Sequence, residues 1–314
     1  MSKKIAFVFP GQGSQEVGMG KALFEGTEIG RRHFEQAAQV LGFDLASACF
    51  SGPEEALKRT GVAQPALFTH GVICGEWLRA QGITPTHAAG HSLGEYTALC
   101  AAGVFDFATG LALVKARGEA MNQASEATKG VMSAILGLSV EVLDRLCQEA
   151  QAHGVVTVAN INAPGQVVIS GEPDAVDAVE EAAKTAGAKR VVRLVVHGAF
   201  HSPLMATAAI PMRKALAAAA LSAPQARFVA NTTGGFLDNP GEIRDQLAAQ
   251  ITGCVRWVDC VTALADDGVE MFIELGPGAV LAGLIKRIRK GAVCLSAGDP
   301  ESLGKIVEAV RAGA

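Results

Sequence analysis

A chain of 314 residues, 49% of them hydrophobic, is long enough to bury a large core and to form one large domain with a smaller companion. Its formal net charge of −4 argues against a nucleic-acid-binding surface, and no apolar run reaches the ~18 residues that a membrane span needs. Seven scattered cysteines without a C-x-x-C pair, and an N-terminus without a signal-peptide core, predict a cytoplasmic protein that holds neither zinc nor disulfides.

The chain opens with a strand from Ile5 to Phe9, the glycine-rich loop Pro10 to Gln15 and a helix near Met19 to Phe24. The loop is not a dinucleotide fingerprint, because a match starting at Gly11 would need glycine where Glu16 stands. Backbone N–H groups in a loop at the carboxyl end of a strand can still face a ligand, and a simple tight turn is the alternative.

Two helices, Arg31 to Leu41 and Gln64 to Ala80, precede the most informative stretch, which is Gly90-His91-Ser92-Leu93-Gly94. Glycines two residues on either side of a serine allow a strand to turn sharply into a helix with the serine at the apex, the nucleophile elbow. The residues from Leu93 to Ala102 are rich in helix formers, as this reading requires. Ser92 is therefore the candidate nucleophile, and the N–H of Leu93, at the helix N-terminus, can receive an oxyanion. A plain glycine-flanked turn is the alternative.

A longer helix is expected to start at the N-cap Asp106, and its apolar stripe contains Val114 and Met121. Arg117 projects from this stripe. Its guanidinium either reaches water at the edge of the stripe or forms a buried clamp for a carboxylate supplied by a substrate.

From Lys129 onward the pattern changes to that of a separate unit. Strands and helices alternate in the order βαββαβ, which is typical of a ferredoxin-like domain: strand Val131 to Leu138, helix Val140 to Ala150, strands Val155 to Ile161 and Gln166 to Ser170, helix Glu172 to Ala186, strand Arg190 to Val196. We therefore expect residues 128–197 to form a small subdomain inserted into a large one made of 1–127 and 198–314. Asn160 and Asn162 either line the cleft between the two or form a turn.

A serine nucleophile needs a base, and His201 is the best-placed histidine. It follows the last strand of the insert and precedes a helix capped by Ser202, with Pro203 as its first residue. His197 is the competing candidate, whereas His91 either faces away from Ser92 or lines the mouth of the site. The other four histidines, His33, His70, His87 and His153, are expected to be structural or solvated.

The remainder returns to α/β alternation. The expected elements are helix Pro203 to Ala220, strand Arg227 to Asn231, helix Glu242 to Ile251, strand Met271 to Leu275, the turn Gly276-Pro277-Gly278, helix Val280 to Arg289, a strand near Val293 to Leu295, and a terminal helix. A basic cluster at Lys286, Arg287, Arg289 and Lys290 either meets an acidic partner or is a solvated helix end.

Six motifs in order along the chain make it resemble the malonyl-CoA:acyl carrier protein transacylases over nearly its whole length. They are Phe9-Pro10-Gly11-Gln12-Gly13-Ser14-Gln15, Gln64-Pro65-Ala66, Gly90-His91-Ser92-Leu93-Gly94-Glu95, Arg117-Gly118, Gly198-Ala199-Phe200-His201-Ser202 and Glu274-Leu275-Gly276-Pro277-Gly278. The resemblance implies an α/β-hydrolase-like large subdomain and a ferredoxin-like small one. His197 and Gly253-Cys254 are less usual for the family and affect the fine shape of the pocket.

The resemblance also implies a ping-pong acyl transfer in fatty acid synthesis. Ser92, deprotonated by His201, takes the malonyl group from malonyl-CoA and passes it to the phosphopantetheine thiol of acyl carrier protein. The oxyanion hole is then formed by the N–H groups of Gln12 and Leu93, and Arg117 binds the malonyl carboxylate. Phe200 resembles the family's malonyl-type residue, and Gln250 orients His201 in place of a triad acid, for which Asp259, Asp266 and Asp267 are the alternatives. The expected enzyme is a monomer that carries no cofactor of its own.

Three other functions remain open. A serine esterase or thioesterase shares the elbow and the base but transfers the acyl group to water. A non-catalytic module that binds a carrier protein would retain the fold with a decayed site. An acyltransferase of a polyketide pathway would use another extender unit.

Overall fold

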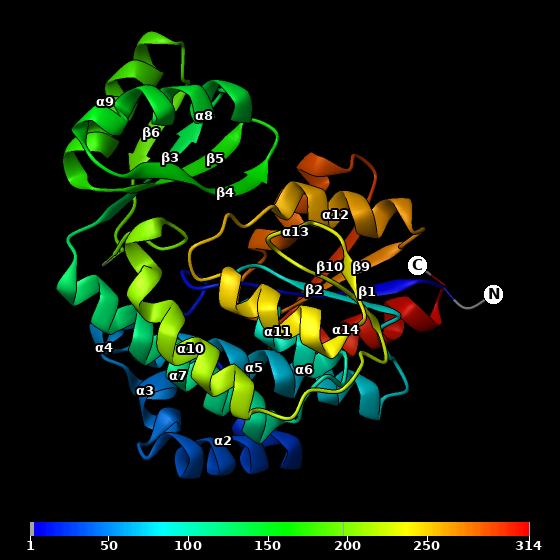
Figure 1. Cartoon of the computed structure of the whole chain (residues 1–314). Coiled ribbons are helices and arrows are strands. Elements are labelled where there is room, and N and C mark those ends of the chain that lie inside the picture. Colours follow the sequence, from blue (N-terminus) through cyan, green and yellow to red (C-terminus); the bar gives the residue numbers. More distant parts are fainter. Residues whose placement is uncertain (1–2, 197, 314) are drawn as a thin grey trace.

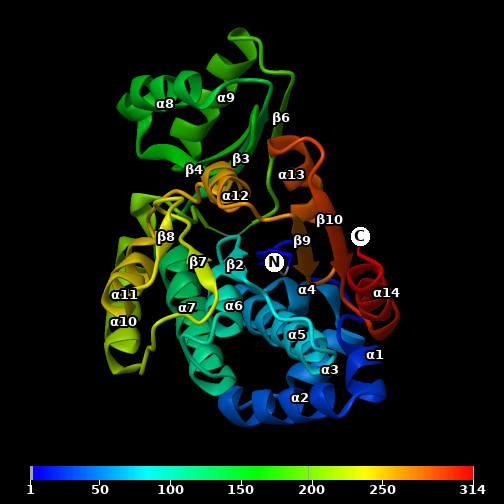
Figure 2. The ribbon, with the colours of Figure 1, turned by 90° about the vertical axis from the view of Figure 1, so that its right-hand side faces the viewer.

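The computed structural model describes residues 3–196 and 198–313, which contain two separate β-sheets (Figures 1 and 2). The larger sheet is formed by β1 (Ile5–Phe9), β2 (His87–Gly90), β7 (Arg227–Val229), β8 (Phe236–Leu237), β9 (Met271–Leu275) and β10 (Val293–Ala297). The smaller sheet is formed by β3 (Val131–Leu136), β4 (Val156–Ala163), β5 (Gln166–Gly171) and β6 (Arg190–Arg193). The chain is therefore a mixed α/β protein with a large and a small unit, as predicted.

The large sheet has the strand order β10-β9-β1-β2-β7-β8 and is parallel except for its edge strand β8. Around it lie α1 (Lys21–Gly26), α2 (Glu28–Leu41), α3 (Leu45–Ser51), α4 (Glu54–Lys58), α5 (Thr60–Ala80), α6 (Gly94–Ala101), α7 (Phe107–Ala127), α10 (Ala206–Ala218), α11 (Pro240–Ala249), α12 (Trp257–Asp266), α13 (Val280–Ile288) and α14 (Pro300–Arg311). A short 3₁₀ helix, Pro203–Met205, leads into α10.

Both faces of this sheet are covered, and the side chains of β1 show how. Ile5, Phe7 and Phe9 join the core cluster formed with α5, α6 and α7, whereas Ala6 and Val8 join the cluster formed with α12 and α13. Side chains that alternate between two apolar layers explain why the strand is a continuous hydrophobic run rather than an alternating one.

The small sheet is antiparallel with the order β4-β5-β3-β6. Helices α8 (Val140–Glu149) and α9 (Pro173–Thr185) cover one face of it, at the top of Figure 1, and a 3₁₀ turn, Ala150–His153, follows α8. This is the βαββαβ order predicted from the sequence, with the two crossover helices on one side.

The two units meet through backbone hydrogen bonds as well as side chains. The N–H of Ile161 in β4 donates to the carbonyl of Val255 over 2.9 Å, and the N–H of Val255 donates to Ala159 over the same distance. Arg287 in α13 donates to the carbonyl of Pro164 and to Gln166 at the β4–β5 turn. One member of the basic cluster thus holds the small sheet against the large unit.

Several element boundaries differ from the prediction. Helix α5 begins at Thr60 rather than Gln64 and contains Pro65 in its second turn. The strand expected to reach Val196 ends at Arg193. Helices α3, α4 and α12 and strand β8 were not predicted. No helix in the described ranges is long and apolar enough to span a membrane.

Candidate active site

Ser92 stands between β2 and α6, where the chain turns from strand to helix. Its φ angle of 52° lies in the left-handed region, the strained geometry expected of a nucleophile elbow. The flanking glycines allow this turn: a Cβ at Gly90 would overlap the carbonyl oxygen of Gly94, and a Cβ at Gly94 would overlap that of Phe9. The predicted strand, turn and helix are all present.

Replacing Gly94 by alanine is expected to destabilise the protein by about 3 kcal/mol, because the new methyl group would press against rigid backbone. Urea unfolding of wild type and variant measures this difference. Gly61, whose Cβ would contact nothing within 4 Å, gives the matched control for adding a methyl group. Equal stability of Gly94→Ala and Gly61→Ala would contradict the tight packing of the elbow.

Asn231, just beyond β7, holds both sides of the elbow. Its side-chain oxygen accepts from the N–H of Ser92 over 2.8 Å, and its side-chain nitrogen donates to the carbonyl of Gly90 over 2.7 Å. A single amide therefore fixes the strained turn from the neighbouring strand.

His201 faces the serine at hydrogen-bonding distance. Its Nε2 is 2.7 Å from Ser92 Oγ, and its Nδ1 is 2.9 Å from the carbonyl oxygen of Gln250 and 3.1 Å from that of Gly253. Because carbonyl oxygens only accept, Nδ1 must carry the proton, which leaves Nε2 as the acceptor for the Ser92 hydroxyl. His201 also has a positive φ angle of 59°, and the competing candidate His197 lies outside the described residues.

A catalytic triad has an acid that accepts from the histidine, and here the backbone carbonyl groups of Gln250 and Gly253 take that place. Gln250 contacts His201 through its main chain, so its side chain is free for another partner. The aspartates considered as alternatives lie elsewhere in the structure: Asp267 bonds to His87, and Asp259 pairs with Arg256.

The pKa of His201 is lowered to about 3, chiefly by burial and in addition by the nearby Arg117 and His91, while the Gln250 and Gly253 carbonyls act in the opposite sense. The imidazole is thus neutral at physiological pH and ready to accept a proton.

This pKa shift predicts how stability depends on pH. Between pH 3 and 6.5 the unfolded chain binds a proton at position 201 that the folded chain does not, so the wild type loses stability as the pH falls through this window. His201→Asn, which tolerates the left-handed backbone, lacks this loss and should gain about 2 kcal/mol relative to wild type between pH 7.5 and pH 5. Denaturant unfolding at the two pH values measures this change. An unchanged difference in stability would contradict a buried, neutral His201.

Arg117 is only 1% exposed, so the buried alternative of the sequence analysis is the correct one. Its Nη2 donates to Ser92 Oγ over 3.1 Å and to the side-chain oxygen of Gln250 over 2.9 Å, and its guanidinium lies 5.6 Å from the centre of the Tyr96 ring. Its buried Nε–H has no acceptor among the described residues. A substrate carboxylate that entered this site would meet a fixed cation with a donor to spare.

A cavity of about 110 Å³ joins these groups. The large unit lines it with Gln12, Gln64, His91, Ser92, Arg117, Met121, Phe200 and His201, and the small unit with Met132, Asn160, Leu194 and Val196. Within the described part of the chain, the N–H groups of Gln12 and Leu93 have no acceptor, which suits an oxyanion hole. His91 lines the cavity and donates to Asn162 over 2.7 Å, and Asn160 also lines it; both asparagines lie within β4 rather than in a turn.

Three residues that organise the site were not identified from the sequence as functional: Glu95, Asn231 and Gln246. Glu95 enters the sequence analysis only as the last residue of the Gly90–Glu95 motif, yet it is fully buried. Burial raises its pKa to about 7, against the hydrogen bonds of Asn231, Gln246 and Gln250. An acid in an otherwise apolar helix is a signal of such burial, because it needs hydrogen-bond partners from elsewhere in the chain.

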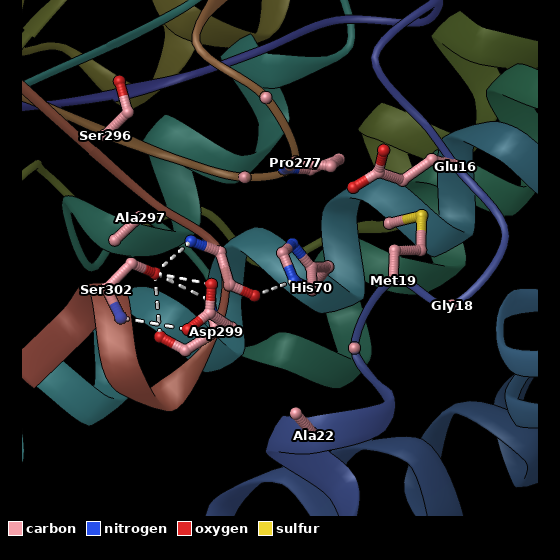
Figure 3. Close-up of a pocket in the computed structure, with 14 residues that line it drawn as sticks. Glu16, Gly18, Met19, Ala22, His70, Pro277, Ser296, Ala297, Asp299 and Ser302 are labelled. Carbon is pink, nitrogen blue, oxygen red and sulfur yellow. Dashed lines mark hydrogen bonds between the residues drawn. The ribbon is translucent and has the colours of Figure 1, made fainter.

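A second cavity, of about 260 Å³, is lined by none of Ser92, His201 and Arg117 (Figure 3). It lies where β9 and β10 end and contains His70, whose Nε2 donates to the Gly298 carbonyl. Burial lowers the pKa of His70 to about 4, which fits the expected structural role. No cluster of three potential metal-ligating His, Cys, Asp or Glu side chains occurs among residues 3–196 and 198–313.

Known proteins with similar sequences and structures share this arrangement of the chain. The acyl transferase domain family matches residues 6–306. A malonyl CoA-acyl carrier protein transacylase from Bacillus subtilis is 40% identical over 309 residues, which cover 98% of each chain. An acyl carrier protein S-malonyltransferase from Vibrio cholerae has a TM-score of 0.94 and 42% identity, with 97% of this chain and 100% of that chain covered.

Another similar structure contains a carrier protein as well. It is titled a type II PKS acyl-carrier protein in complex with its malonyl-transacylase, and it matches with a TM-score of 0.93, 39% identity and coverage of 98% and 99% of the two chains. The sequence motifs, the fold and these similarities agree: the chain belongs to the acyl transferase domain family, together with the malonyl CoA-acyl carrier protein transacylases.

Proposed function

We propose that the enzyme moves a malonyl group from malonyl-CoA to the phosphopantetheine thiol of acyl carrier protein through a malonyl ester on Ser92, which supplies fatty acid elongation. The observation that carries this proposal is the position of Ser92 Oγ, 2.7 Å from the neutral nitrogen of His201 and 3.1 Å from the Arg117 guanidinium. A nucleophile, a base and a fixed cation in one cavity fit an acyl donor that ends in a carboxylate.

In the first half-reaction, His201 Nε2 takes the hydroxyl proton of Ser92 while Oγ attacks the thioester carbon. The oxyanion receives hydrogen bonds from the N–H groups of Gln12 and Leu93. When the carbon–sulfur bond breaks, the CoA thiolate takes the proton from His201. In the second half, the carrier-protein thiol gives its proton to His201 and attacks the ester, and Ser92 leaves with that proton.

Malonyl selectivity is assigned to Arg117 and Phe200. A carboxylate in a water-poor cavity is costly unless it is paired, so a buried guanidinium favours malonyl and disfavours acetyl, which leaves the cation unmatched. Phe200, 7% exposed, lies against the same cavity and limits the room for a methyl branch. Gln250 orients His201 through its carbonyl group.

The acyl donor and the carrier arm are proposed to reach Ser92 through a larger neighbouring cavity of about 670 Å³, which shares Gln12 and Val196 with the site. Lys58 lines this cavity as an ion pair with Glu54, and Arg59 provides positive charge for a phosphate group.

We further propose that the chain divides into a large subdomain, 1–127 and 198–314, and a small one, 128–197. We also propose that the enzyme is a monomer that carries no metal or organic cofactor of its own, as the resemblance implies. The seven cysteines are all free thiols, which supports a cytoplasmic location.

The deciding experiment supplies the protein with malonyl-CoA and holo acyl carrier protein, and measures malonyl-carrier protein, free malonate and CoA together. Acetyl-CoA and methylmalonyl-CoA serve as competitors. We expect malonyl-carrier protein as the main product, with malonyl-CoA preferred over both competitors. Malonate as the main product would instead assign the chain to the thioesterases.

A polyketide pathway is the second candidate, because one of the similar structures is titled with a type II PKS carrier protein. The chemistry at Ser92 is the same, and the two pathways differ in the carrier protein and, where another extender unit is used, in the acyl donor. Comparing kcat/KM for carrier proteins of the two pathways from the source organism distinguishes them.

A further inference from the structure

Glu95, in the first turn of α6, is a fully buried carboxylate that forms no ion pair with a described residue. Three groups bond to it: the N–H of Asn231 over 2.6 Å, the Nε2 of Gln246 over 2.8 Å and the Nε2 of Gln250. All three are donors, so the carboxylate is the acceptor in every case. The Glu95 side chain does not line the cavity that contains Ser92.

The side chain of Gln250 connects Glu95 to the site. Its amide nitrogen donates both to Glu95 and, over 2.8 Å, to the carbonyl oxygen of Ser92. Its amide oxygen accepts from Arg117 Nη2 over 2.9 Å. A flipped amide would set its oxygen against two acceptors and its NH₂ group against the guanidinium. Only one orientation of Gln250 satisfies all its neighbours, and the carboxyl group of Glu95 is one of the acceptors that select it.

Arg117 depends on that orientation. Its buried charge has no carboxylate in direct contact within the described ranges, and the nearest negative charge bonded to its partners is that of Glu95, one amide away. The same Nη2 that bonds to Gln250 also bonds to Ser92 Oγ. The chain of hydrogen bonds from Glu95 through the Gln250 amide to Arg117, here called the Gln250 bridge, therefore sets the position of the guanidinium relative to the nucleophile.

We propose that Glu95 is a positioning residue for acyl-group selectivity: acting through the Gln250 amide, it holds Arg117 where the carboxylate of a malonyl group on Ser92 can pair with it. This inference rests on the proposed function and adds to it a residue whose side chain contacts neither the cavity nor the hydroxyl of Ser92.

The test compares kcat/KM for malonyl-CoA and acetyl-CoA in wild type and in Glu95→Gln, with folding checked by thermal unfolding. The substitution keeps the shape but replaces an acceptor with an NH₂ group that opposes the amide nitrogen of Gln250. We expect kcat/KM for malonyl-CoA to fall about tenfold or more, mostly through KM, and that for acetyl-CoA to change less than about threefold.

Gln246→Met is the matched control, since it removes a different donor from the same carboxylate and leaves the Gln250 bridge intact. It should lower thermal stability without changing the ratio of malonyl to acetyl activity. If Glu95→Gln lowers both activities in equal proportion, or leaves the ratio at the wild-type value, Glu95 only supports the fold and the inference is wrong.

A second variant, Glu95→Gln with Gln250→Glu, keeps one carboxylate and one amide in the pair and so tests the idea if the single variant does not fold. It places a carboxylate directly beside Arg117, where it competes with malonyl, and we expect a larger loss of malonyl preference. Wild-type preference in this variant would overturn the inference. If wild type itself fails to load malonyl, the proposed function fails instead, and the two failures are distinguishable.

Discussion

Replacing Ser92 by alanine is expected to lower malonyl transfer by about 10⁴-fold or more, because it removes the hydroxyl oxygen that His201 can activate to form the acyl intermediate. Ser92 Oγ forms hydrogen bonds with His201 Nε2 and with Arg117 Nη2, and alanine lacks this oxygen. Initial rates of CoA release with carrier protein present measure the effect.

The variant must also be folded for this result to count. The Asn231 contacts to the elbow run through the backbone of Ser92 and Gly90 and do not need the hydroxyl, so thermal stability should remain close to wild type. Retention of more than about a tenth of the activity in a folded Ser92→Ala protein would show that the acyl group does not pass through this serine.

Replacing Arg117 by alanine is expected to lower kcat/KM for malonyl-CoA by about 10² to 10³-fold, because the malonyl carboxylate would then be buried without a partner. Transfer of acetyl should rise, since a buried cation that acetyl cannot match is removed. Competition between the two donors, followed by mass spectrometry of the carrier protein, gives the ratio directly.

Arg117→Lys is the control that separates charge from geometry. Lysine keeps the positive charge but lacks the planar fork that bonds to both Gln250 and Ser92, so it should restore only part of the malonyl preference. An esterase would behave differently. Its wild type would show no preference for malonyl, and its Arg117→Ala variant would hydrolyse uncharged acyl thioesters at the wild-type rate.

Much of the fold follows from local patterns in the sequence. The buried strands, the helix N-cap at Asp106 and the βαββαβ insert depend on neighbours in the chain, and the structure has them within a few residues of the expected positions. Helix α12 was missed although its buried positions Trp257, Cys260, Val261 and Leu264 follow helical spacing. Helices α3 and α4, with seven and five residues, are too short to give a clear period.

The site could be predicted as far as its motifs reach. Ser92 follows from local sequence, and the choice of His201 follows from its place at a strand end before a capped helix, whereas the sequence left open whether Arg117 is buried or reaches water. The Gln250 bridge could not be predicted in this way, because the residues that bond to Glu95 lie 136 to 155 positions further along the chain. Only the packing of α6, α11 and the end of β7 brings them together. Hydrogen bonds between distant elements leave no periodic pattern in a single sequence.

The most direct measurement is the intact mass of the protein after a brief exposure to malonyl-CoA without a carrier protein. The account predicts that wild type gains the mass of one malonyl group, that fragmentation places it on Ser92, and that holo acyl carrier protein removes it. A chain that stays unlabelled, or that carries the malonyl group on a residue other than Ser92, would contradict the acyl-enzyme mechanism.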